Sequence, residues 1–127
     1  MLTSVQQLNY VIVLCEDLPR MKAFYQALFA FPIDSESETS LAFRAGNGLL
    51  LALRQRTRAY DGRGVRSALP GVQLAFLVTP AAVDQCYEQL VALGVTILDP
   101  PTDQPRGHRT VYFADPEGNQ LEIYAEI

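Results

Sequence analysis

Glu122 is the strongest candidate for a chemically active side chain. It is a carboxylate within the apolar stretch near the end of the chain. It stands between Leu121 and Ile123, so side-chain alternation along a strand sends it to the face opposite those two residues. If the apolar face packs on helices, a partly desolvated carboxylate on the other face could act as a general base or hold a cationic group. The other interpretation is a structural charge that pairs with Arg54 or another arginine across the sheet, and both stay open.

His108 is the only histidine of the chain, so a metal site built on two histidines is excluded. It directly precedes a predicted strand at 109–114. There it could contact a ligand or transfer a proton, because imidazole titrates near neutral pH. It could equally be a surface residue beside Arg106 and Arg109.

An arginine-rich segment spans residues 54–66 and contains a single acidic residue, Asp61. One interpretation is a solvated loop. The other is a flap whose guanidinium groups help to hold an anionic ligand. The arginines concerned are Arg54, Arg56, Arg58, Arg63 and Arg66.

The elements that must position these residues occur in two similar sets. In the first set, the apolar residues 8–15 predict a strand, Asp17 predicts an N-cap, and residues 18–30 have the spacing of an amphipathic helix that Pro32 ends. Gly46-Asn47-Gly48 predicts a hairpin turn. The short strands expected after the helix are 33–37, 40–45 and 48–54.

The second set starts with a strand at 72–78, followed by Thr79 as N-cap and Pro80 at the first helical position. Gly94 should end the helix as its C-cap. The residues expected along one helical face are Val83, Cys86, Leu90 and Leu93. Further strands are expected near 95–99, 109–114 and 119–125.

The two sets align as an internal repeat. Tyr25 corresponds to Tyr87, and Gly48 to Gly118, provided that extra residues in the second copy fall at 99–108. The sequence thus predicts a single domain over 1–127, made of βαβββ modules at about 6–54 and 72–127 with a linker at 55–71. This order of elements is typical of an α+β fold.

Composition limits the classes of partner that the protein can bind and its expected location in the cell. The formal net charge is −4, which argues against nucleic acid, since such binding depends on basic contacts to phosphate. No apolar run approaches the length needed to span a membrane, and the N-terminal residues lack the pattern of a signal peptide. The expected location is the cytoplasm, with no membrane partner.

Two stretches resemble the vicinal-oxygen-chelate superfamily, which is the glyoxalase/bleomycin resistance protein/extradiol dioxygenase family. One is the opening strand and helix with their Phe-Tyr pair, LNYVIVLCEDLPRMKAFYQALFAF (8–31). The other is the closing hairpin with its Asp-Pro-Glu-Gly-Asn turn, RGHRTVYFADPEGNQLEIYAEI (106–127). The resemblance covers nearly the whole chain. It implies that the modules form a curved, half-open mixed-sheet barrel with helices outside, a concave ligand face, and a homodimer.

The resemblance also implies four metal-ligand positions, two in each module: Tyr10, Ala52, Gln73 and Glu122. Glu122 is a sound oxygen ligand and Gln73 a possible one, but alanine cannot ligate and a phenol does so rarely. No cofactor is therefore expected, and a divalent metal is possible but disfavoured.

On this fold the concave face should be lined by aromatic and apolar residues with a few polar anchors, as small-molecule pockets are. The expected function is binding of a small organic molecule in a Tyr-lined cup without a chelated metal. The rival is a lyase, isomerase or dioxygenase-like enzyme in which Glu122 is a base or a weak metal ligand. The tyrosines could also fill the cup and leave no site. A third alternative is a fold that serves only as a dimer or interaction module. The expected ligand-binding residues are Tyr10, Arg54, Gln73, Tyr112, Glu122 and Tyr124.

Overall fold

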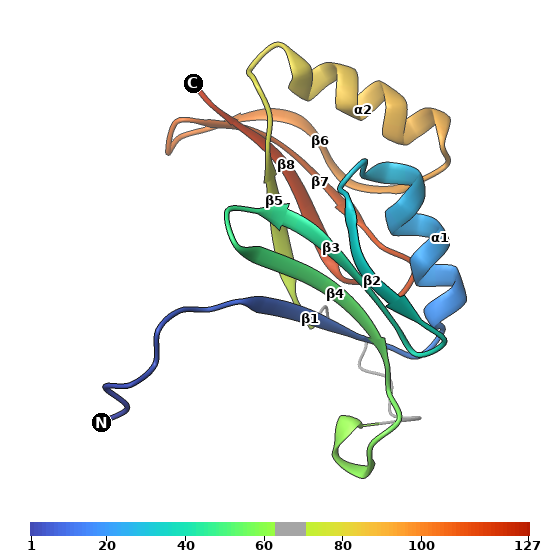
Figure 1. The fold of residues 1–127 in the computed structure, drawn as a ribbon. Coiled ribbons are helices and arrows are strands. Elements are labelled where there is room, and N and C mark those ends of the chain that lie inside the picture. The colour runs from blue at the N-terminus through green and yellow to red at the C-terminus, as the bar shows by residue number, and fades with distance from the viewer. Residues whose placement is uncertain (63–70) are drawn as a thin grey trace. The chain divides into compact units, whose positions relative to one another are not determined.

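The computed structural model describes residues 1–62 and 71–127. Contacts group the chain into two compact units, Met1–Val65 and Arg66–Ile127. Each unit contains one four-stranded mixed sheet and one α-helix (Figure 1).

The first unit has the sheet order β1-β4-β3-β2, in which β1 is parallel to β4 and the other pairs are antiparallel. Its elements are β1 (Tyr10–Cys15), α1 (Leu18–Leu28), β2 (Ile33–Ser37), β3 (Ser40–Gly46), β4 (Leu49–Gln55) and the short 3₁₀ helix η1 (Ala59–Asp61).

The second unit repeats this topology with the order β5-β8-β7-β6. Its elements are β5 (Gln73–Leu77), α2 (Ala82–Ala92), β6 (Thr96–Gln104), β7 (His108–Ala114) and β8 (Gln120–Glu126). The predicted α+β fold of two βαβββ units is confirmed.

Helix α1 begins as predicted. The Asp17 side chain accepts a hydrogen bond from the backbone N–H of Arg20 at 3.2 Å, which satisfies one of the free donors of the first turn. The helix buries Leu18, Met21 and Tyr25. In the same unit, alternate strand residues such as Leu51 and Leu53 are also buried, and α1 contacts β4. These side chains form the core of the first unit.

Helix α2 begins later than predicted. Its first residue is Ala82 and no side chain caps it, so the prediction of Thr79 as N-cap is wrong. The carbonyl of Thr79 instead accepts from the N–H of Ala82 at 3.0 Å, in a turn that precedes the helix. Leu93 is the C-cap and is exposed, because Gly94 at φ 73° turns the chain out of the helix there. The helix lies along β6, β7 and β8 (Figure 1).

Strand β6 is longer than expected. It runs through Pro100 and Pro101 to Gln104, so the extra residues of the second copy lengthen a hairpin and do not form a loop. Irregular register between Ile97 and Thr102 accommodates the prolines. In its sheet β6 is an edge strand, which is where strands tolerate proline, because a residue without an N–H group interrupts the ladder of a central strand.

None of the helices in the described ranges is long and apolar enough to cross a membrane.

Candidate ligand site

Glu122 lies on the face of the second sheet that points away from α2. Arg109 on β7 donates to Asp84 on α2 at 2.7 and 3.1 Å, so the odd-numbered residues of β7 face the helix. The even-numbered Tyr112 therefore points to the other face, and its register partner across the ladder is Glu122. Strand alternation thus gave the face of Glu122 correctly. As a whole residue, Glu122 is only 6% exposed there.

The two oxygens of Glu122 have different surroundings. Oε2 accepts a hydrogen bond from Nε2 of Gln73 at 3.4 Å. Oε1 lies 3.7 Å from Nη2 of Arg106, too far for a hydrogen bond. Within residues 1–62 and 71–127, this buried oxygen has no hydrogen-bond partner. A buried carboxylate oxygen without a donor is costly, so the site is suited to a group that brings one.

Arg106 connects Glu122 with a tyrosine. Its Nη2 also donates to the hydroxyl of Tyr112 at 2.8 Å. In the sequence Arg106 stands out only as a neighbour of His108, and this contact was not predicted. The available signal was its position in the tight turn before β7, which brings a long side chain back over the strand.

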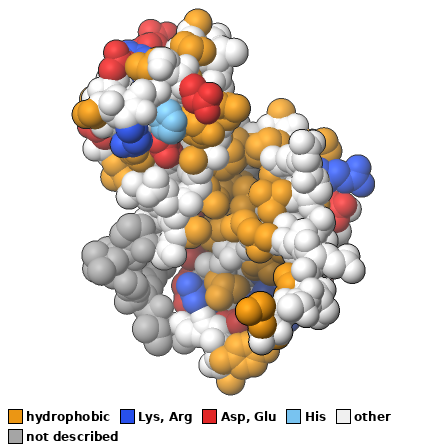
Figure 2. All heavy atoms as spheres, turned by 90° about the vertical axis from the view of Figure 1, so that its left-hand side faces the viewer, with side chains coloured by type: hydrophobic (Ala, Val, Ile, Leu, Met, Phe, Trp, Pro, Cys, Tyr) orange, Lys and Arg blue, Asp and Glu red, His pale blue; other side chains and the backbone are white. Residues whose placement is uncertain are grey.

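His108 and Tyr124 form a ring pair on the same face, with centroids 5.0 Å apart. Both rings are half-buried. Figure 2 shows the histidine, pale blue, at the surface near basic and acidic side chains. The second unit therefore gathers four of the predicted ligand-binding residues on one sheet face, with His108 and Arg106 beside them. The four are Gln73, Tyr112, Glu122 and Tyr124.

In the first unit, Tyr10, Ala52 and Arg54 share the sheet face that points away from α1, as their register on β1 and β4 requires. Tyr10 is 46% exposed and Ala52 is buried. This face offers a phenol and a methyl group at the two positions where the resemblance implies metal ligands.

Arg54 is held by an acidic residue of its own unit. Its Nη1 and Nη2 donate to the two oxygens of Asp61, each at 3.0 Å. The hydrogen bond to Asp61 raises the pKa of Arg54. Within the second unit Arg106 forms an ion pair with Glu122. Arg54 of the first unit is already engaged in an ion pair with Asp61 that a ligand would have to break.

Asp61 organises the described part of the arginine-rich segment. Besides Arg54, its Oδ2 accepts from the backbone N–H groups of Thr57 and Arg58, each at 2.9 Å. Arg56 donates to its backbone carbonyl. The segment up to Gly62 is thus a hydrogen-bonded turn and not a loop of free guanidinium groups. Arg63 and Arg66 lie outside the described residues.

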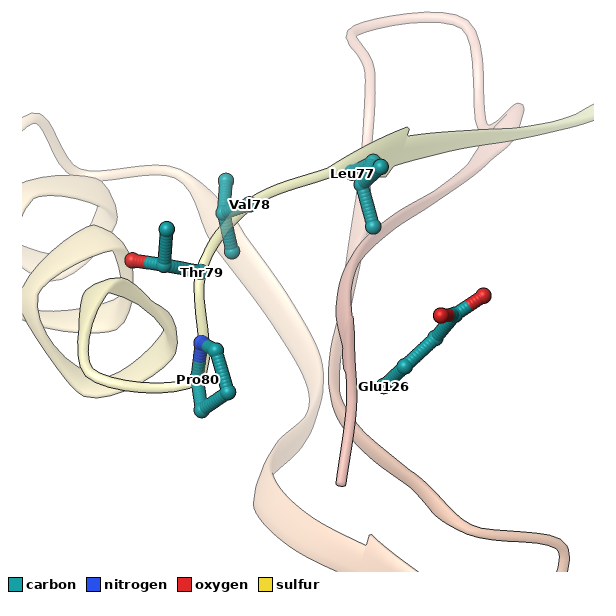
Figure 3. Close-up of a pocket in the computed structure, with 5 residues that line it drawn as sticks. All are labelled: Leu77, Val78, Thr79, Pro80 and Glu126. Carbon is teal, nitrogen blue, oxygen red and sulfur yellow. The ribbon is translucent and has the colours of Figure 1, made fainter.

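Two surface hollows lie at the ends of β5. One of about 230 Å³ is lined by Gly71, Val72, Gln73 and Gln120. The other, of about 410 Å³, is lined by Leu77, Val78, Thr79, Pro80 and Glu126. Figure 3 shows Leu77 at the end of β5, Glu126 on the neighbouring β8, and the other three residues on the connection to α2. The smaller hollow adjoins the polar anchor Gln73.

The model of the Glyoxalase/Bleomycin resistance protein/Dioxygenase superfamily matches residues 7–123. The chain belongs to this superfamily. This confirms the family resemblance that was inferred from the opening strand and helix and from the closing hairpin.

Relatives within this superfamily cover most of the chain. It is 28% identical to the metallothiol transferase FosB of Lysinibacillus sphaericus (strain C3-41) over 121 residues. The aligned residues cover 95% of this chain and 83% of that protein. It resembles the crystal structure of a glyoxalase/bleomycin resistance protein/dioxygenase from Nocardioides with a TM-score of 0.82 and 25% identity, covering 98% of this chain and 86% of that chain. The fosfomycin resistance protein FosX from Listeria monocytogenes shares the fold, with a TM-score of 0.74, 23% identity, and 97% and 95% of the two chains covered.

The four positions that correspond to the superfamily's metal ligands do not fit a chelated ion. Ala52 has no donor atom, and Tyr10 would have to lose its proton. Gln73 turns its amide nitrogen, a hydrogen-bond donor, toward Glu122. In the described parts of the chain, no group of three or more His, Cys, Asp or Glu residues could hold a metal ion.

Proposed function

We propose that this glyoxalase/bleomycin resistance-type protein binds a small organic molecule on the Tyr-rich sheet face around Glu122, without a chelated metal ion. Gln73, Tyr112 and Tyr124 are the ligand-binding neighbours of Glu122 in the second unit. In the first unit we propose Tyr10 and Arg54 as ligand-binding residues, and Arg54 is the weaker candidate because of its ion pair with Asp61.

One observation carries this proposal: Oε1 of Glu122 is buried and accepts no hydrogen bond from the described residues. Buried polar atoms are nearly always paired, so an open acceptor on a sheet face suggests a ligand that supplies the donor. Aromatic rings beside it add apolar contact area and stacking surfaces. A planar molecule with an N–H or O–H group suits this combination.

The proposal is tested by an NMR screen of aromatic fragments that carry hydrogen-bond donors. Fragments should bind the wild type, and Glu122→Gln should weaken them about tenfold or more, because an amide N–H replaces an acceptor that receives a charge-assisted hydrogen bond. Glu38→Gln, at an exposed position of the first unit, is the matched control and should change nothing. Equal affinity of the wild type and Glu122→Gln would contradict the proposal.

The alternative proposal is a metal- or Glu122-assisted enzyme such as a lyase, isomerase or dioxygenase-like protein. It is favoured by the name of the FosB relatives, metallothiol transferase, and by Glu122 as an oxygen donor. Elemental analysis of protein purified without chelator separates the two. A stoichiometric ion that Glu122→Gln loses would support the enzyme, whereas substoichiometric metal is expected for the ligand-binding protein.

We also propose a cytoplasmic homodimer, on the basis of the family resemblance. Sedimentation velocity tests the dimer, and a monomer at micromolar concentration would contradict it.

A further inference from the structure

The guanidinium of Arg106 occupies the approach to the open oxygen of Glu122. Arg106 lies in the turn between β6 and β7, where the N–H of Gly107 donates to the carbonyl of Gln104 at 3.0 Å. Its Nη2 contacts both Tyr112 Oη, at 2.8 Å, and Glu122 Oε1, at 3.7 Å. The cation is therefore beside the carboxylate without forming the hydrogen bond that Oε1 lacks.

This contact should be easy to displace. The Arg106 side chain is 52% exposed, whereas that of Glu122 is 8% exposed. An ion pair with one long, half-exposed partner contributes little, because water screens the charge and the side chain loses rotational freedom when it is held. Removing the guanidinium from Glu122 would thus cost little, while the buried carboxylate would gain from a partner with better geometry.

The surroundings favour a planar cation as that partner. A carboxylate matches the paired N–H groups of an amidinium or guanidinium. The ring pair of His108 and Tyr124 lies on the same face and offers an aromatic wall. The other nearby arginine, Arg109, is turned to the opposite face and bound to Asp84 and Asp103. An anion would meet the buried carboxylate and be repelled.

We propose that the ligand of this site is a planar organic cation of the amidinium or guanidinium class, which displaces the guanidinium of Arg106 and pairs with Glu122. Arg106 acts as an internal competitor that occupies the place of the ligand when the site is free. The inference rests on the proposed function, because it specifies the ligand class of the same site.

Benzamidinium is a suitable probe, with neutral benzamide and anionic benzoate as isosteric comparisons. Dissociation constants are measured by NMR titration of the full chain, with amide shifts at the site as the readout. Benzamidinium should bind more tightly than both comparisons. Arg106→Gln should tighten it by about two- to fivefold, which is the release expected from a surface ion pair. Glu122→Gln should weaken it about tenfold or more.

Arg44→Gln is the matched control, since it removes one positive charge from an exposed arginine of the first unit. It should leave the dissociation constant unchanged, which separates local competition from the change in net charge. Arg106→Gln alters an exposed side chain and should fold normally, so the competition is measurable even if Glu122→Gln is unstable.

The outcomes distinguish this inference from the proposed function. If benzamide or benzoate binds at the site as tightly as benzamidinium, the cation class is wrong while the proposed function stands. If Arg106→Gln leaves the affinity of benzamidinium unchanged or weakens it, Arg106 is not a competitor and the inference is overturned. If none of the three probes shifts the amides of the site, the inference is overturned for this ligand class, and the fragment screen alone decides the proposed function.

Discussion

At the scale of single residues, Asp61 and Glu122 illustrate two states of a buried carboxylate. Asp61 is 5% exposed and accepts hydrogen bonds from a guanidinium and two backbone N–H groups. These hydrogen bonds, chiefly that of Arg54 and then that of Arg58, hold the pKa of Asp61 well below its usual range. Glu122 is as deeply buried but has an oxygen without a described donor. Asp61 therefore stabilises its turn, whereas Glu122 is the carboxylate for which we propose a ligand.

Asp61→Asn should destabilise the protein at neutral pH, because the ion pair to Arg54 and the charge that stabilises the turn are lost. A carboxyl with a lowered folded pKa contributes stability above its unfolded pKa and loses it as the pH falls. The difference between wild type and variant should therefore be fully present at pH 7 and shrink below about pH 4, where Asp61 becomes protonated in the unfolded chain first. Urea unfolding midpoints at neutral and acidic pH measure this.

The control for this prediction is Asp103→Asn, whose side chain is 64% exposed and whose ion pair to Arg109 is screened. It should shift the midpoint little at either pH. A difference for Asp61→Asn that stays constant from pH 7 to acidic pH would refute the role given to the Asp61 charge.

At the scale of elements, the end of α2 shows how local hydrogen bonds stop a helix. The N–H of Gly94 donates to the carbonyl of Val91 at 3.0 Å, and the N–H of Val95 to that of Leu90 at 3.1 Å. This pattern requires a left-handed residue between helix and strand, and Gly94 has φ 73°. Gly94 thus turns the chain from the end of α2 into β6.

Gly94→Ala should lower the free energy of unfolding by about 1 kcal/mol, because a left-handed conformation is unfavourable for a residue with a Cβ atom. Apart from the adjacent residues, no described atom lies within 4 Å of the added methyl group, so the cost belongs to the backbone alone. Gly46→Ala is the matched control, since its added Cβ likewise meets no atom of the described residues beyond its chain neighbours, and its φ is not in the left-handed region. Chemical denaturation compares them, and equal stabilities would contradict this explanation.

At the scale of the whole molecule, the two units repeat one topology, and each contains buried apolar side chains. A unit of about 60 residues buries too little surface to be more than marginally stable alone. The small size of each unit therefore supports the prediction of a single domain over 1–127. The prediction can be tested by measuring whether the two units unfold together.

We expect one cooperative transition in calorimetry, with equal calorimetric and van't Hoff enthalpies. Leu53→Ala in the first unit and Leu121→Ala in the second, both fully buried, should each destabilise the same transition by about 2–5 kcal/mol. Leu2→Ala, at an exposed position, is the control and should leave the transition in place. Two transitions, of which each core variant shifts only one, would show that the units are independent domains.

The sequence by itself determined the features that local backbone geometry dictates. Strand alternation placed Glu122 and Tyr112 on the face away from α2, the Asp17 cap marked the start of α1, and Gly94 marked the end of α2. These features depend on neighbouring residues, whose relative positions the backbone fixes.

The tertiary structure decided which distant side chains meet. The pairs Arg54–Asp61 and Arg106–Glu122 depend on how turns return long side chains to a strand, which no residue spacing specifies. The prolines of β6 were compatible with a loop or a strand, and only the edge position of β6 in the sheet selected the strand. The open oxygen of Glu122 likewise became visible only in three dimensions, because hydrogen-bond satisfaction is a property of packing.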